Sequence, residues 1–143
     1  MSTELVEVNL AEVHASDYLS AAFLDSPAVT REGVDGQYAL AMAYHALNAG
    51  VDAAELRQVR DEIADENGPA FVAAGGSGDA PEQARESIRR AASRWTERCP
   101  ELAELFTLAA SLVTTWRAYS ALLFHVDRIS KQVAIISGLR KQA

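Results

Sequence analysis

The sequence lacks the features that mark secreted and membrane-spanning proteins. It contains a single cysteine, Cys99, which cannot form an internal disulfide and suits a reducing compartment. No stretch of about 18 apolar residues is free of charge, so no transmembrane helix is expected. The N-terminus carries Glu4 and Glu7 without a basic region, so no signal peptide is expected either. These absences predict a cytoplasmic protein.

Aromatic residues are also few, at 7% of the chain, whereas alanine is abundant with 27 of the 143 residues. Alanine favours helix by intrinsic propensity. Leucine, isoleucine, valine and phenylalanine together number 34, which is more than disordered chains carry. The length suits one hydrophobic core. The composition therefore predicts a single all-α domain over residues 1–143, a helical bundle of four to six helices with a long C-terminal helix.

The net charge of −7 hides an asymmetry between the two halves of the chain. Residues 1–79 hold 14 acidic and 3 basic residues, a net charge of −11. Residues 80–143 hold 6 acidic and 10 basic residues, a net charge of +4. The net negative charge of the whole chain argues against nucleic acid as a partner, but the net positive charge of residues 80–143 keeps that alternative open.

Apolar spacing and capping residues predict three helices in the first half. Ser16 can cap a helix that ends at Leu24. Residues 37–48 are apolar on nearly every side, which indicates a central, buried helix that Gly50 ends. Asp52 can cap a surface helix with a narrow apolar face, expected to end at residues 67–69. That face consists of Leu56, Val59 and Ile63.

A glycine-rich stretch separates the two halves. Residues 67–80 contain four glycines and Pro69, which predicts a flexible connection at the point where the net charge changes sign. The run at 75–78 lacks the Lys-Ser/Thr pair of a phosphate-binding loop. We expect a helix to follow it, from about residue 79 to Arg98.

The strongest periodic signal lies in the last forty residues. Apolar residues recur there at steps of three and four, close to the 3.5-residue spacing of a coiled-coil seam. One helix over residues 101–136 would be about 54 Å long. Such a helix either breaks, at Thr114–Thr115 or Ser137–Gly138, or projects toward a partner. We assign partner binding to six residues of this stripe: Leu112, Trp116, Tyr119, Leu123, Val126 and Ile129.

Five arginines fall on the predicted helix before Cys99. Their guanidinium groups could contact an anion, a nucleic acid or an acidic protein, or could pair with Glu82 and Glu86 on the same helix. The acidic helix 52–66 could also dock against them, within one chain or between neighbouring chains. The five candidates are Arg85, Arg89, Arg90, Arg94 and Arg98.

Enzymatic sites are less well supported by the residue pattern. The acidic cluster at 61–66 has carboxylates at a spacing that could hold a divalent cation. Arg117 and His125 lie two turns apart on one predicted helix and could form a catalytic pair. His14 falls in an uncertain N-terminal segment, and His45 is most simply a packed residue of the apolar helix. Cys99 has no histidine close to it in sequence.

These observations favour a non-enzymatic assembly or adaptor protein that requires no cofactor. It would act by self-association or by docking into a larger complex, with protein as its partner. One alternative is a nucleic-acid-binding subunit that uses the arginine helix 85–98. A second alternative is a small helical hydrolase or nuclease, which would use the acidic cluster with a metal or the pair Arg117 and His125.

Overall fold

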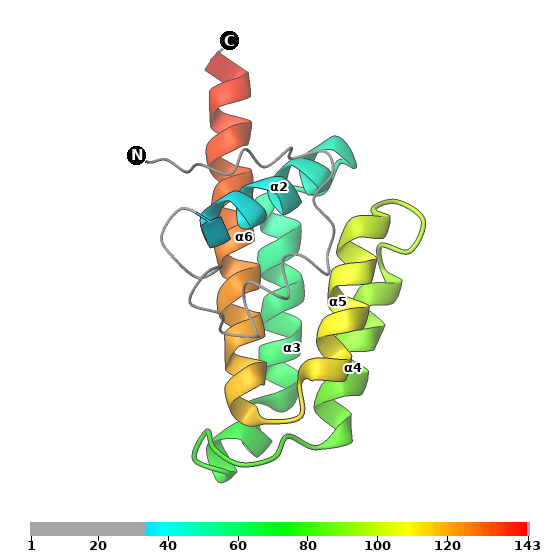
Figure 1. The fold of residues 1–143 in the computed structure, drawn as a ribbon, viewed down its shortest axis with the longest axis vertical. Helices are drawn as coiled ribbons and strands as arrows, with labels where there is room; N and C mark the ends of the chain where they lie inside the picture. Colours follow the sequence, from blue (N-terminus) through cyan, green and yellow to red (C-terminus); the bar gives the residue numbers. More distant parts are fainter. Residues whose placement is uncertain (1–33, 143) are drawn as a thin grey trace.

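The computed structural model describes residues 34–142, and within this range the protein is all-α, as predicted (Figure 1). The expected helix at 16–24, together with His14, lies outside the described residues. The five described helices are α2 (Val34–Asn48), α3 (Ala53–Ala73), α4 (Glu82–Ser93), α5 (Pro100–Leu112) and α6 (Trp116–Gln142). None of them is long and apolar enough to cross a membrane.

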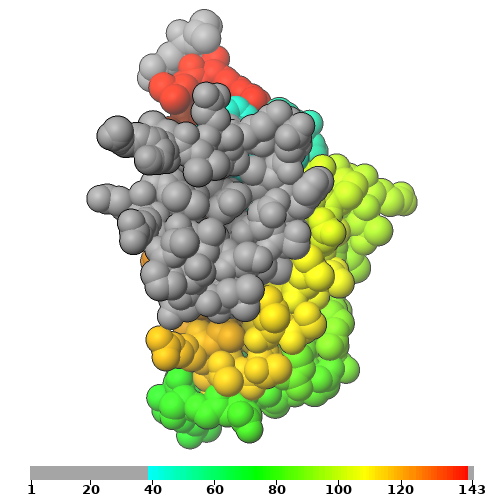
Figure 2. Space-filling view, in the orientation of Figure 1, coloured from blue at the N-terminus to red at the C-terminus, as the bar shows by residue number. Residues whose placement is uncertain are grey.

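Four of the helices form a bundle that the remaining helix crosses at one end. α3 and α6 lie side by side in opposite directions, as do α4 and α5, and α3 also contacts α4 (Figure 1). α2 contacts both α5 and α6. Figure 2 shows the last described turns of α6 at one end of the molecule beside α2, and the connection after α3 at the opposite end.

The first part of the described chain matches its sequence pattern closely. Ala39, Met42 and Ala43 on α2 are completely buried, which confirms the prediction of a buried helix, but α2 crosses one end of the bundle and is not central in it. Gly50 ends that helix with a φ of +80°, a conformation that costs glycine little. Asp52 then caps α3, because its side chain accepts a 2.8 Å hydrogen bond from the Glu55 N–H.

α3 does not end at residues 67–69, as predicted, but continues through Pro69 to Ala73. Proline removes one helical hydrogen bond, yet tertiary contacts hold the helix on both sides of it. Asn67 is buried and donates to the Ile63 carbonyl and to Ser87 Oγ. Phe71 packs edge-on against Trp116, with ring centroids 5.5 Å apart.

The glycine-rich connection is therefore shorter than the predicted range of 67–80, because residues 67–73 are helical. At Gly76 φ is +71°, and an added Cβ would lie 3.1 Å from the Phe71 ring, so a side chain would be strained there. The end of the connection is hydrogen bonded to the segment between α5 and α6. Ala80 donates to the Thr114 carbonyl, and Trp116 donates to the Gly78 carbonyl.

α4 ends at Ser93, earlier than the predicted Arg98. Residues 94–98 form a turn that places Trp95 in the core, where it is completely buried. Its ring packs against Phe106 at a centroid distance of 5.1 Å. Burial of this large side chain outweighs continuation of the helix, and helix propensity alone cannot reveal such a tertiary effect.

The C-terminal apolar stripe spans two helices. The last forty residues therefore do not form one continuous helix. Residues 113–115 separate α5 from α6, so the expected break at Thr114–Thr115 is confirmed. The other candidate, Ser137–Gly138, lies inside the continuous helix α6. The stripe is thus divided between a helix that packs on α4 and one that packs on α3.

Candidate functional site

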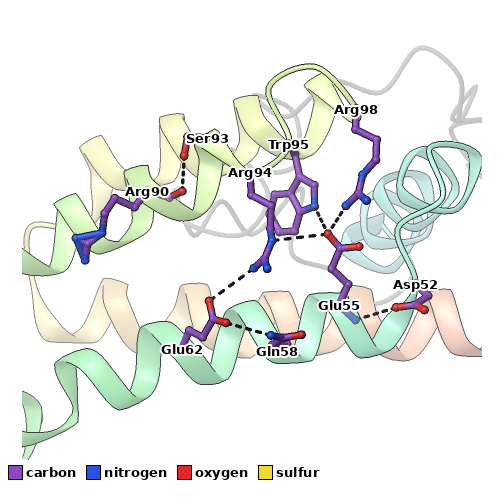
Figure 3. Close-up of polar contacts among 9 residues, drawn as sticks. All are labelled: Asp52, Glu55, Gln58, Glu62, Arg90, Ser93, Arg94, Trp95 and Arg98. Carbon is purple, nitrogen blue, oxygen red and sulfur yellow. Dashed lines mark hydrogen bonds and ion pairs between the residues drawn. The ribbon is translucent and has the colours of Figure 1, made fainter.

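The residues of the predicted arginine helix lie against the acidic face of α3 (Figure 3). Glu55 is at the centre of this contact. Its Oε2 atom accepts a 2.9 Å hydrogen bond from the Trp95 indole N–H and pairs with the Arg98 guanidinium. Arg94 approaches the same carboxylate, with 3.9 Å between its Nε and Glu55 Oε2. One carboxylate thus joins α3 to the turn after α4.

Two further carboxylates of α3 extend this contact toward the other end of the helix. Arg94 Nη1 lies 3.6 Å from Glu62 Oε1, and Arg90 pairs with Glu66. These ion pairs confirm, within one chain, the hypothesis that the acidic helix docks against the arginines. We call this set the arginine–carboxylate network: Glu55, Glu62, Glu66, Arg90, Arg94 and Arg98.

The two remaining arginines pair within α4. Arg85 and Arg89 each contact Glu82 at 2.8 Å, which confirms the expected pairing of Arg85 with Glu82. Hydrogen bonds from Arg89 and then from Arg85 lower the pKa of Glu82 below its usual value. The expected pairing of Glu86 with Arg89 or Arg90 is not seen in the described chain, where Arg89 pairs with Glu82 and Arg90 with Glu66. Arg85 also donates to the Val113 carbonyl, at 3.0 Å.

An open hollow of about 600 Å³ lies beside the network, at the start of α3. Two acidic and two basic side chains line it, so its charges balance. Such a lining does not favour a phosphate over a neutral ligand. The lining residues are Asp52, Ala54, Glu55, Gln58, Arg94 and Arg98.

The acidic cluster at 61–66 is mostly occupied by cations of the protein itself. Glu62 and Glu66 face the arginines of the network, and Asp61 lies 2.9 Å from Arg60. In the described part of the chain, no three or more histidine, cysteine, aspartate or glutamate side chains are placed to hold a metal ion. The structure therefore gives the metal-dependent alternative no support there.

Cys99 lies near a histidine that sequence reasoning could not place beside it. Its Sγ atom is 3.7 Å from the His45 carbonyl oxygen and 3.9 Å from a Glu101 carboxylate oxygen. His45 Nδ1 is in turn 3.7 Å from Glu101. Burial raises the pKa of the Cys99 thiol above its usual value, and a thiol that stays protonated is a weak nucleophile. This group is better suited to packing than to catalysis.

Arg117 and His125 are not brought together as a catalytic pair. They lie eight residues apart on α6, which corresponds to about 12 Å along the helix. Arg117 is exposed, while His125 is half-buried and its ring contacts Phe124 at a centroid distance of 5.3 Å. A reaction that uses both side chains at one atom would need a different arrangement.

The stripe assigned to partner binding is mostly core, so that assignment was wrong. Four of its six residues are at most 3% exposed: Trp116, Tyr119, Val126 and Ile129. Leu123 packs against the core, and only Leu112, at 38%, counts as exposed. The stripe signalled burial correctly, but the buried contacts are made with α2 and α3 of the same chain.

Sequence reasoning assigned no site to three large apolar side chains of α6 that lie in solvent, away from the buried side of the helix. Phe124 is 63% exposed, Ile135 55% and Leu139 62%. Eleven residues, about three helical turns, separate Phe124 from Ile135, and Leu139 lies one turn further along. Lys131, one turn before Ile135, has a 73% exposed side chain. We call this surface, formed by Phe124, Lys131, Ile135 and Leu139, the outer face of α6.

No family model matches the sequence, and comparisons with curated proteins and with solved structures give no match.

Proposed function

We propose that the protein is a non-enzymatic assembly or adaptor protein that docks onto another protein through the outer face of α6. The observation that carries this proposal is the exposure of Phe124, Ile135 and Leu139 on one side of one helix. Single exposed apolar residues are common, whereas a group of them on one face is typical of a protein contact site.

The buried side of α6 also supports this proposal, because it holds the helix in the bundle without help from the outer face. Val126, Ile129 and Val133 are at most 1% exposed and hold the helix in the bundle. The apolar residues of the outer face are therefore not needed to keep α6 in place. A helix that is fixed on one side and apolar on the other can present a preformed surface to a partner.

The arginine–carboxylate network supports this proposal over the nucleic-acid alternative. Phosphate binding draws on cations that can exchange counterions for phosphates. Arg90, Arg94 and Arg98 already lie against carboxylates of α3, and these carboxylates would repel a phosphate backbone. The arginines are better explained as the contact that holds α4 to α3.

Photocrosslinking from the outer face tests the proposal. A photoreactive amino acid would replace Ile135, and a matched control would replace Glu104, an exposed residue of α5. In the protein's own host cells, we expect discrete adducts of defined mass from position 135 and none of them from position 104. The same adducts from both positions, or no adduct from position 135, would contradict docking through this face.

A further inference from the structure

We infer that α4 and α5 form a hairpin that opens away from α3 as one unit, about a hinge made of residues 78–80 and 114–116. A contact centred on Glu55, at the opposite end of the hairpin, acts as the latch. The opening is independent of the proposed docking at α6. Three features of the hairpin carry it: paired connections at one end, packing between its own two helices, and a largely charged contact with α3.

The hinge consists of the two chain segments that connect the hairpin to the rest of the bundle. Ala80, just before α4, donates to the Thr114 carbonyl at 3.0 Å. Trp116, at the start of α6, donates to the Gly78 carbonyl at 2.9 Å. The chain thus enters and leaves the hairpin at the same end (Figure 1). A rotation at this end moves both helices together and leaves the chain on either side in place.

The hairpin has apolar contacts of its own. α4 packs more extensively on α5 than on α3. The Trp95 ring, in the turn between the two helices, packs against Phe106 of α5 at a centroid distance of 5.1 Å. Ile88 of α4 and Phe106 are both completely buried. Units of two packed helices of this kind are the segments that open cooperatively in folded proteins.

The contact between α3 and α4 is largely charged and incompletely packed. A hollow of about 130 Å³ lies between the two helices and is lined by residues of both. One buried hydrogen bond crosses the contact, from Asn67 to Ser87 Oγ at 3.1 Å. The ion pairs of Arg90 and Arg94 with α3 join side chains that are 37–59% exposed, and such pairs add little stability.

The latch lies at the end of the hairpin farthest from the hinge. There Glu55 accepts a 2.9 Å hydrogen bond from the Trp95 indole N–H and pairs with Arg98 (Figure 3). α2 contacts the same end, where Cys99 Sγ lies 3.7 Å from the His45 carbonyl oxygen. A carboxylate that accepts from a buried donor is worth more than an exposed ion pair. Glu55 is therefore the single residue that most favours the closed hairpin.

Opening would uncover an apolar part of α3. Val59 and Ile63 line the hollow beside α4 and are at most 3% exposed in the closed structure. When the hairpin moves away, these side chains become accessible. A ligand that binds them would shift the protein toward the open state, and the latch sets how much binding energy this requires.

Hydrogen exchange of backbone amides in the full chain tests the opening. It is followed by NMR at several urea concentrations below the unfolding transition. We expect the slowest amides of α4 and α5 to share one exchange rate, at least about tenfold above that of the slowest amides of α3 and α6. Their urea dependence should also be weaker, because opening exposes less surface than unfolding. One common rate and urea dependence in all four helices, or separate openings of α4 and α5, would overturn the inference.

Two variants distinguish hairpin opening from global unfolding. Glu55→Ala breaks the latch, which is lost in both processes, so exchange should become about tenfold faster in all four helices. Ile129→Val alters a buried contact of α6, which packs on α2 and α3 and stays folded in the open state. It should speed exchange of α3 and α6 by about threefold to tenfold and leave α4 and α5 within about twofold. Equal acceleration of all helices by Ile129→Val would overturn the inference.

A milder pair of variants keeps the test decisive if Glu55→Ala does not fold. Glu55→Gln retains an acceptor for Trp95 but removes the charge that pairs with Arg98, so exchange of α4 and α5 should become about threefold faster. Glu104→Gln makes the same change at an exposed position of α5 and should leave the exchange rates nearly unchanged. Equal effects of the two variants would contradict a latch at Glu55.

Discussion

The protein has two surfaces rich in charge, and they differ in what surrounds the charges. In the contact between α3 and α4, each arginine lies near a carboxylate, and Trp95 beside them is completely buried. On the outer face of α6, Lys131 pairs with Asp127 of the same helix and lies among apolar side chains that are more than half exposed. Ion pairs between helices indicate a structural contact, whereas a group of exposed apolar side chains supports the proposed contact with another protein.

The largest expected effect is the difference in unfolding free energy between an isoleucine-to-alanine substitution on the buried side of α6 and one on its outer face. Ile129→Ala removes a side chain that is 1% exposed and should lower the free energy of unfolding by about 2–5 kcal/mol. Ile135→Ala removes a side chain that is 55% exposed and should lower it by about 0.5 kcal/mol or less. Urea denaturation measures both values, and similar losses would mean that the outer face is part of the fold.

The second effect concerns the centre of the arginine–carboxylate network. Glu55→Ala leaves the buried indole N–H of Trp95 without its acceptor and should cost about 1–3 kcal/mol in unfolding free energy. Glu104→Ala, an exposed position on α5 with no ion pair in the described chain, should stay within about 0.5 kcal/mol of the wild type. Equal changes of unfolding free energy in the two variants would contradict the structural role assigned to the network.

The smallest effect is a pH dependence at α4. Because Arg89 and Arg85 lower the pKa of Glu82, ionised Glu82 stabilises the folded state above the usual carboxyl pKa. This contribution is lost as the pH falls through the lowered folded-state pKa. Glu82→Gln should therefore reduce stability near neutral pH and match the wild type at strongly acidic pH.

Urea titrations at both pH values would show this difference, with Glu86→Gln on the same helix as a control. We expect the control to leave the wild-type pH dependence unchanged, since Glu86 has no ion pair in the described structure. A constant gap between Glu82→Gln and the wild type at all pH values would rule out the ionic origin of the effect.

The sequence predicted helices well where local signals and tertiary packing agree. Asp52 marks the helix cap and Gly50 the helix end that the structure has, and Ala39, Met42 and Ala43 are buried as the apolar composition of residues 37–48 indicated. Local signals predicted the wrong helix ends where tertiary contacts determine the end of a helix. Pro69 does not end α3, since Phe71 packs on Trp116, and α4 ends early because Trp95 turns into the core.

The candidate site was predictable only in part for a similar reason. Spacing shows which residues share a helix face, but not which face the rest of the chain covers. The stripe from Leu112 to Ile129 was therefore assigned to a partner, although α2 and α3 cover the part of it that lies on α6. Phe124, Ile135 and Leu139 fall outside that stripe, and their exposure depends on the positions of the other helices.

The central claim is that the outer face of α6 serves binding and not folding. Its most direct test is the crosslinking yield from a photoreactive residue at position 139 in the Ile135→Asp variant. We predict that the adduct yield falls about tenfold, while the unfolding free energy stays within about 0.5 kcal/mol of the wild type. An unchanged adduct yield in this variant would contradict the claim.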